Sequence, residues 1–133
     1  LEIQIVRALI LLERYDEAQV AIARLPEGRF RDYGLALQHR APDRLADANA
    51  ALERLGAQTG DAQDSVRLAE VYAFRGMNDL AFAYLQEKRA EYEREKARKP
   101  YLVWYFLDDL RLSPFLRPLH ADPRWSALVA RPA

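Results

Sequence analysis

The sequence predicts an all-α protein built from pairs of short helices, and three observations support this prediction. Apolar residues recur at steps of three and four over most of the 133 residues, which is the period of an amphipathic helix. No stretch alternates apolar and polar residues over a useful length, and no Asn-Gly or Asp-Gly pair marks a β-hairpin. The five glycines stand singly between or beside the periodic segments, so we interpret them as helix stops and turns.

The first helix pair is expected within residues 3–25. Its apolar residues fall on one face of each helix, and the charged run at residues 14–17 separates the two helices with a tight turn. The periodic positions are Ile3, Val6, Leu9, Ile10, Ala18, Ile22 and Leu25. Pro26 and Gly28 then end the second helix.

The second pair is expected within residues 33–56. The periodic positions of its first helix are Tyr33, Ala36, Leu37 and Arg40. After Pro42, Asp43 is expected to cap a helix over residues 44–55, because aspartate accepts hydrogen bonds from the first backbone N–H groups of a helix. Gly56 is expected to end that helix in the left-handed conformation.

The third pair is expected to open at Gly60 and Asp61. The periodic positions of its two helices are Val66, Ala69, Tyr72 and Ala73, then Ala81, Tyr84 and Leu85. Gly76 is expected to end the first of these helices, and Asn78 to cap the second.

The three pairs resemble one another and resemble tetratricopeptide (TPR) repeats. Ala18, Ala48 and Ala81 each lie early in the second helix of a pair, 30 and then 33 residues apart, and TPR repeats have a period of about 34 residues. The third pair matches best, with residues 68–72 followed by Gly76, Ala81 and Leu85. The turns at residues 14–18 and 76–82 also resemble those of the family. This resemblance implies an α-α superhelix of about three degenerate TPR-like hairpins.

A narrower resemblance covers residue 44 to the end of the chain. Residues 68–76, 79–85 and 116–125 are similar to the C-terminal TPR region of bacterial signalling proteins, in which the repeats follow an adenylate/guanylate cyclase, a winged-helix regulator or a Ser/Thr kinase domain. The segment of residues 91–106 departs from that pattern, because it is longer and more charged than the resemblance leads us to expect. We expect a cytoplasmic location. Because the chain begins at Leu1 inside an amphipathic pattern, we expect it to be a piece of a longer protein.

The expected organisation is a single structural domain, with TPR-like repeats over residues 1–99 and capping helices packed on the last repeat over residues 100–133. A stack of helix pairs otherwise ends with an exposed apolar face. Ser113-Pro114 and Asp122-Pro123 each place a capping side chain before a proline. Residues 87–99 are expected to form a solvated helix with Arg89–Glu93 and Glu95–Lys99 ion pairs.

The composition argues against several classes of protein. Twenty basic and twenty acidic residues give no net charge, so no overall field attracts nucleic acid or anionic lipid. Glutamates are interleaved among the basic residues of the stretch 88–99 and offset their charge, so nucleic-acid binding is not expected. The absence of cysteine excludes disulfides and Cys-ligated zinc. The longest apolar stretch has seven residues, from 101 to 107, too few to span a bilayer.

No residue pattern predicts catalysis, a metal site or a cofactor in this chain. His39 takes the aromatic position of its repeat and is expected to pack, and the same is expected of His120. Asp108 and Asp109 point about 100° apart on a helix, so they do not converge on one ion. The serines at 65, 113 and 126 lack a nucleophile-elbow context, and no glycine cluster forms a phosphate loop.

The expected function is protein–protein interaction without enzymatic activity, in which a partner protein or peptide binds a concave helical groove. By the family resemblance, the groove is lined by Tyr33, Leu37, Arg40, Arg67, Glu70 and Phe74. Tyr101, Trp104 and Tyr105 have two interpretations, packing on the last repeat or a second interface for a partner or a second copy of the chain. A homodimer or an intramolecular contact with another domain is therefore possible. The alternative function is a C-terminal regulatory or dimerisation domain that acts in cis on an upstream cyclase, kinase or DNA-binding domain.

Overall fold

The computed structural model describes residues 2–57 and 62–131. Within these ranges the chain forms α-helices and one 3-10 helix and contains no strand, which confirms the all-α prediction. The helices form two compact units, which we call the N-terminal unit (Leu1–Gly60) and the C-terminal unit (Asp61–Ala133). The third helix pair and the expected capping segment belong to the same unit. The superhelical stacking of three TPR-like hairpins stays a prediction.

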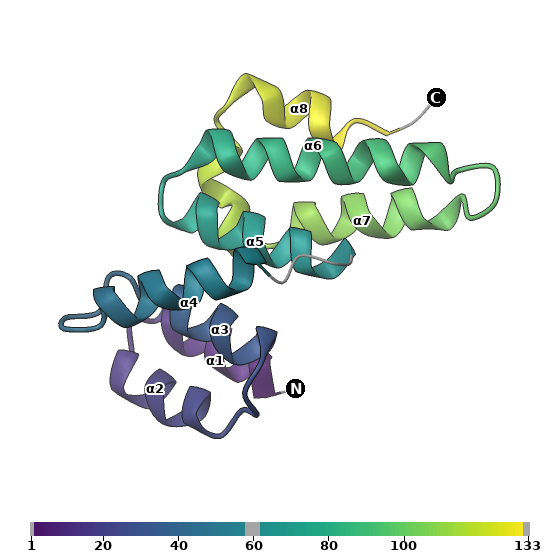
Figure 1. The fold of residues 1–133 in the computed structure, drawn as a ribbon. Helices are drawn as coiled ribbons and strands as arrows, with labels where there is room; N and C mark the ends of the chain where they lie inside the picture. The colour runs from purple at the N-terminus through teal and green to yellow at the C-terminus, as the bar shows by residue number, and fades with distance from the viewer. Residues whose placement is uncertain (1, 58–61, 132–133) are drawn as a thin grey trace. The chain divides into compact units, whose positions relative to one another are not determined.

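The N-terminal unit consists of two helical hairpins. Their helices are α1 (Glu2–Leu11), α2 (Tyr15–Ala23), α3 (Arg29–Ala36) and α4 (Leu45–Ala57). α1 packs against α2 and α3 packs against α4, while α3 also contacts both helices of the first hairpin (Figure 1). The apolar positions predicted for these helices supply most of the buried core, including Val6, Ile10, Ala18, Ile22, Tyr33, Ala36, Leu37 and Ala48.

Gly34 allows α3 to approach the first hairpin closely. A Cβ atom at this position would lie 3.0 Å from Cγ1 of Ile22 and 3.3 Å from Cγ1 of Val6. Polar contacts hold the same helices together at other points. Arg44 donates to the backbone carbonyl of Tyr15 at 2.7 Å and pairs with the Asp16 carboxylate at 2.9 Å, so the start of α4 is tied to the start of α2.

Two expected helix ends in the N-terminal unit are wrong. Asp43 has a positive φ of 63° and lies before the cap position, because the first bond of α4 runs from the N–H of Ala48 to the carbonyl of Arg44 at 2.9 Å. Gly56 lies inside α4 rather than after it, and it does not have the positive φ of a left-handed stop.

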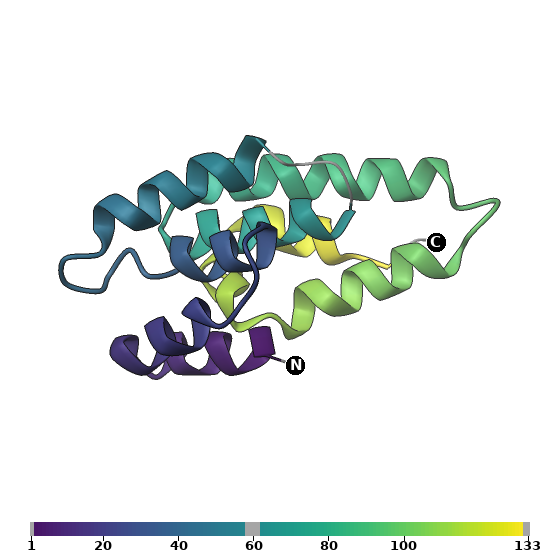
Figure 2. The ribbon, with the colours of Figure 1, turned by 60° about the horizontal axis from the view of Figure 1, so that its bottom comes forward.

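The C-terminal unit is built on a long helical hairpin. Its elements are α5 (Ala62–Phe74), α6 (Asn78–Arg94), α7 (Tyr101–Leu112), the 3-10 helix η1 (Pro114–Leu119) and α8 (Pro123–Val129). α5 packs against α6, and α7 returns along α6 after a turn. η1 contacts α5, and α8 contacts both α6 and α7 (Figure 2). The expected opening of the third pair at Gly60 and Asp61 lies outside the described residues.

A continuous apolar core joins the elements of the C-terminal unit. Every element of the unit contributes to it, which is why the capping segment and the third helix pair form one body. Its buried members include Ala69, Ala73, Ala81, Phe82, Leu85, Val103, Phe106, Leu107, Leu110, Leu116, Leu119, Trp125 and Leu128.

The predicted helix caps of this unit have mixed outcomes. Gly76 ends α5 with a φ of 82°, a left-handed conformation that glycine adopts without a steric cost, as predicted. Asn78 is wrong as a cap, because Met77 takes the cap position and α6 begins at Asn78. Asp122 is confirmed: its carboxylate accepts from the N–H of Arg124 at 2.9 Å, ahead of Pro123 in the first turn of α8. Ser113 precedes η1, but its hydroxyl makes no capping bond.

The charged run after residue 86 is only partly helical. α6 ends at Arg94, and the chain then turns toward α7. Arg89 and Glu93 form the predicted pair at 3.4 Å. Glu95 and Lys99 lie beyond the helix, where the N–H of Lys99 donates to the carbonyl of Glu95 at 2.9 Å.

Contacts made by three arginines hold both ends of α8 against the rest of the C-terminal unit. Arg124 pairs with Asp79 of α6 at 2.9 Å, and its guanidinium carbon lies 4.3 Å from the centroid of the Phe82 ring. Its hydrogen bonds hold the pKa of Asp122 below the usual range. At the other end, Arg89 of α6 donates to the carbonyls of residues 127 and 128, and Arg111 of α7 donates to that of residue 129. These carbonyls have no partner within α8, so the arginines satisfy them.

Candidate interaction surface

The outer face of α7 carries four large apolar side chains that are exposed. We call this set the α7 stripe: Tyr101 (53% exposed), Trp104 (40%), Tyr105 (65%) and Leu112 (81%). Their spacing of three, four and seven residues places them along one side of the helix. Large exposed apolar side chains that gather on one side of a helix are typical of a binding surface, whereas isolated exposed apolar residues are common.

The opposite face of α7 is buried and fixes which side of the helix faces outward. Val103, Phe106, Leu107 and Leu110 belong to the core of the C-terminal unit, and each is at most 4% exposed. The Phe106 ring lies 5.2 Å from the ring of Tyr92 on α6. Because these side chains face inward, the α7 stripe must face outward. α7 thus serves both interpretations of the aromatic run, with packing on one side and an exposed stripe on the other.

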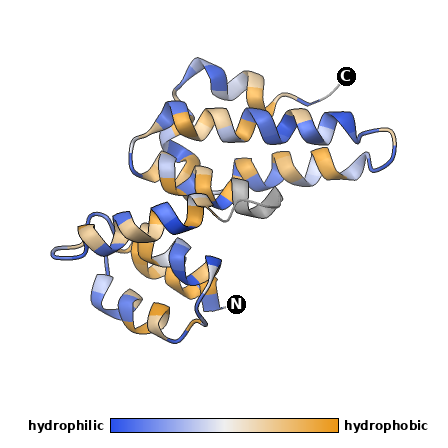
Figure 3. Ribbon diagram, viewed as in Figure 1, coloured by the Kyte–Doolittle hydropathy of each residue, from blue (hydrophilic) through white to orange (hydrophobic). Residues whose placement is uncertain are grey.

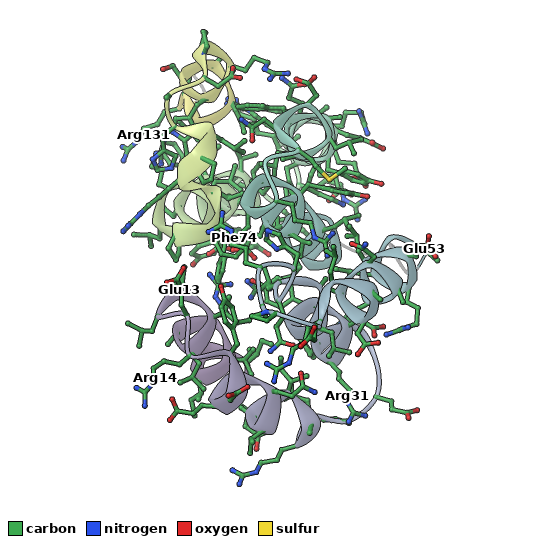
Figure 4. The ribbon with its side chains drawn as sticks, turned by 90° about the vertical axis from the view of Figure 1, so that its left-hand side faces the viewer. Glu13, Arg14, Arg31, Glu53, Phe74 and Arg131 are labelled. Atoms are coloured by element: carbon green, nitrogen blue, oxygen red, sulfur yellow. The ribbon has the colours of Figure 1, made fainter. Side chains whose placement is uncertain are left out.

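Contacts within the C-terminal unit partly order the aromatic rings of the stripe. Tyr101 and Tyr105 lie edge to face, with centroids 5.9 Å apart. Arg131, labelled in Figure 4, places its guanidinium carbon 5.2 Å from the centroid of Trp104. Rings that are already held in place lose little side-chain entropy when a partner binds them.

Opposite charges lie on either side of the three aromatic rings of the α7 stripe, and Leu112 lies beyond the acidic side. We call residues 94–99 the basic turn, because they hold four basic side chains and one acidic one, all exposed, at the start of α7. The half of α6 that leads into this turn is mostly hydrophilic in Figure 3. Asp108 and Asp109, which we call the acidic pair, are exposed near the other end of α7. Asp108 pairs with Arg111 at 3.3 Å.

Most of the charges beside the stripe lack a partner of opposite sign. Among the described residues, Lys96, Arg98 and Lys99 form no ion pair, and neither does Asp109. Ion pairs are common elsewhere in the C-terminal unit, for example between Lys88 and Glu91 at 2.7 Å. The surface around α7 therefore combines apolar rings with charges that are available to another molecule.

The groove residues predicted in the N-terminal unit are not presented together to solvent. Tyr33 is 1% exposed, and its hydroxyl accepts a hydrogen bond from Arg7 at 3.2 Å. Leu37 is fully buried just after α3. Arg40 alone is exposed, in the turn before α4. Two of the three residues therefore support the core rather than line a binding surface.

The groove residues predicted in the C-terminal unit form a packed cluster. The Glu70 carboxylate is buried, and it accepts hydrogen bonds from Arg67 at 3.0 Å and from the hydroxyl of Ser113. Phe74 is half-buried and lies edge to face with Phe115 of η1, with centroids 5.1 Å apart. The structure brings these three residues of α5 together to hold η1.

A pocket of about 540 Å³ lies in the N-terminal unit between α2, α3 and α4, and none of the predicted site residues lines it. Its charged residues are Glu27, Arg31, Asp32 and Arg54. Asp32 and Arg54 pair at 3.0 Å, and Arg31 donates to the carbonyl of Ala23 at 3.4 Å. Two acidic and two basic side chains balance, so the pocket offers no strong preference for a charged ligand.

The residues weighed for chemistry are scattered over the described parts of the chain. No group of three or more His, Asp or Glu residues there could hold a metal ion. His120 packs on Trp125 with ring centroids 4.4 Å apart, and His39 lies half-buried in the turn after α3. Ser126 is exposed on α8, and the side chain of Ser65 lies outside those described.

The pKa shifts of two tyrosines and one glutamate move these groups away from titration near neutral pH. Burial, and then Tyr84, raises the pKa of Tyr72, whose ring stacks on that of Tyr84 at 5.7 Å. Burial also raises the pKa of Tyr15. A hydrogen bond from Lys88 lowers the pKa of Glu91. A general acid or base works best with a pKa near the working pH, and these shifts go the other way.

Comparisons of this chain with family models, with curated proteins and with solved structures found no significant match. None of the described helices combines the length and the apolar character needed to span a membrane. Sequence reasoning found Tyr101, Trp104 and Tyr105 but missed Leu112. The spacing could have identified Leu112, because it lies eleven residues after Tyr101 and thus on the same side of a helix.

Proposed function

We propose that this chain is a non-enzymatic protein–protein interaction module and that the α7 stripe is its contact surface. The observation that carries the proposal is the stripe itself, four large apolar side chains in line on the solvent face of a helix whose other face is buried. Tyrosine and tryptophan are enriched among the residues that dominate binding energy at protein interfaces. An amphipathic helix face with such anchors suits a helix or a groove on a partner protein.

The α7 stripe is a better contact surface than the groove expected from the family resemblance. Tyr33, Leu37 and Glu70 are at most 1% exposed, so a partner could reach them only if the core opened. The stripe needs no such change. Partner binding at preformed, exposed rings avoids the cost of ordering that a rearranged core would add.

A photo-crosslinker at the stripe tests this proposal. Tyr105 is replaced by p-benzoylphenylalanine, and the matched control carries the same amino acid at Phe30, an exposed aromatic residue of the N-terminal unit. Both proteins are irradiated in cells that make the chain, and their helicity is checked by circular dichroism. We expect protein adducts from position 105 and none from position 30. Folded protein with no adduct at position 105, or with equal adducts at both positions, would overturn the proposal.

A further inference from the structure

The basic turn and the acidic pair, on either side of the three aromatic rings, cannot neutralise one another within one chain. α7 has 12 residues, which is a length of roughly 18 Å at about 1.5 Å per residue. The acidic pair lies at least seven residues beyond the start of α7, where the basic turn ends, so their separation along the axis exceeds about 10 Å. That is about one screening length at physiological ionic strength. The exposed side of α7 therefore runs from the basic turn, through the rings of Tyr101, Trp104 and Tyr105, to the acidic pair, and Leu112 lies beyond that pair.

Such a surface is complementary to itself when two copies run antiparallel. In a twofold arrangement the same patch is used by both copies, and each residue on one copy meets its counterpart across the axis. If the axis passes between Trp104 and Tyr105, Tyr101 falls opposite the second copy's Asp108. The basic turn of each copy then approaches the acidic pair of the other. The apolar rings meet in the middle, and the unpaired Lys96, Lys99 and Asp109 gain partners of opposite charge.

We propose that the partner of the α7 stripe is a second copy of this chain, bound antiparallel along α7; this inference rests on the proposed function. A phosphate-bearing partner such as a membrane or a nucleic acid fits less well. Such a partner would bind the basic turn but would be repelled by Asp108, on the same side of α7 as the rings, and by the neighbouring Asp109. Only a partner with both charges, in reversed order, satisfies the whole surface.

The dimer is expected to dissociate reversibly. A helix pair of this length is smaller than a standard interface of about 800 Å² per partner. Screening reaches exposed charges, so added salt should weaken the dimer. The association is therefore measured by sedimentation velocity over a range of concentrations of the purified chain, at low and at physiological salt.

Charge exchange is the decisive experiment. One variant carries Asp108→Lys with Asp109→Lys, and the other carries Lys96→Glu with Lys99→Glu. Each alone places like charges opposite each other, so we expect the dimer dissociation constant to rise at least about tenfold. An equimolar mixture restores opposite charges at both ends, so we expect a heterodimer to form from two chains that are monomeric on their own.

The matched control carries Glu53→Lys with Glu87→Lys, which changes the net charge by the same amount as the first variant at exposed positions outside α7. We expect this control to dimerise as the natural chain does. A further variant, Trp104→Ser with Tyr105→Ser, is expected to be monomeric with its helicity retained. If this variant loses helicity, the mixture of the two charge variants still tests whether the dimer forms along α7.

Three outcomes would overturn the inference. They are a natural chain that stays monomeric at every concentration, a mixture of charge variants that stays monomeric, and a dimer that none of the α7 variants weakens. If the natural chain is monomeric while position 105 still crosslinks to another protein, the proposed function stands and the second copy is wrong. If the chain is monomeric and instead binds anionic vesicles or single-stranded DNA through Lys96 and Lys99, the inference of a second copy is wrong and the partner bears phosphate groups.

Discussion

The hydroxyl of Ser113, between α7 and η1, donates a hydrogen bond to the buried carboxylate of Glu70 on α5. Arg67 donates to the other oxygen of the same carboxylate at 3.0 Å. Ser113 and Glu70 are 6% and 1% exposed. The bond therefore joins segments 43 residues apart inside the C-terminal unit, next to the packing of Phe74 on Phe115.

Replacement of Ser113 by alanine should destabilise the protein, because it leaves an oxygen of a buried carboxylate without this hydrogen bond. Loss of a hydrogen bond to a charged group typically costs about 1–3 kcal/mol. Urea unfolding followed by circular dichroism measures the loss. Ser126→Ala, at an exposed position on α8, is the matched control and should change stability by less than about 0.5 kcal/mol. An equal effect of the two substitutions would contradict the role of the bond.

Two glycines that the sequence assigned the same role should respond in opposite ways to alanine. Gly76 has a φ of 82°, so Gly76→Ala should cost about 1–2 kcal/mol because of the left-handed backbone. Gly56 lies inside α4 with open space at its Cβ position, so Gly56→Ala should stabilise by about 0.5–1 kcal/mol. Thermal unfolding of the two variants in parallel tests the pair. A change in stability of the same sign for both variants would contradict the backbone conformations described for the two glycines.

A larger side chain at Gly34 should damage the packing of α3 on the first hairpin. Even a Cβ atom there would lie 3.0 Å from Ile22, so Gly34→Leu overfills the core and should cost about 1–3 kcal/mol. Ala50→Leu, on the exposed side of α4, adds a side chain of the same size and should leave stability nearly unchanged. Denaturant midpoints that fall equally for both would show that the site has room.

Asp122 should make the stability of the protein depend on pH in the acid range. Hydrogen bonds from the side chain and then the backbone of Arg124 lower its pKa in the folded state below the ordinary 3.8. The folded state therefore favours the charged form, and the resulting stability is present above pH 3.8 and lost as the pH falls through the lowered pKa. Asp122→Asn should reduce the slope of stability against pH below about pH 4. An unchanged slope in acid unfolding would contradict this coupling.

Much of the fold could be predicted from the sequence because apolar periodicity specifies both the presence of a helix and its buried face. The expected helix pairs are present in the described ranges, and Gly76 and Asp122 act as predicted, but the helix expected over residues 87–99 ends at Arg94. The failures concern helix ends. Asp43 and Asn78 have suitable side chains, but the chain reversals before α4 and α6 place the cap one residue away. Local propensity cannot determine a register that is set by tertiary packing.

The candidate site was harder to predict, because periodicity does not say which apolar face remains exposed. Tyr33 and Leu37 were expected to line a groove by resemblance, yet as apolar residues on the inner face of a hairpin they pack in the core. α7 is apolar on two sides, so its sequence fits either packing or binding. Only the placement of Phe106 and Leu107 against the rest of the C-terminal unit decides which side faces outward.

The attachment of α8 by arginines also implies an order of assembly. Seven residues are too few for a helix to persist by itself in water. The groups that hold its two ends come from α6 and α7, so no stable α8 exists before these two helices have docked. α8 therefore joins after α6 and α7 during folding. In the native state it can detach while these two helices stay docked, so its amide hydrogens should exchange with solvent sooner than those of α6 and α7.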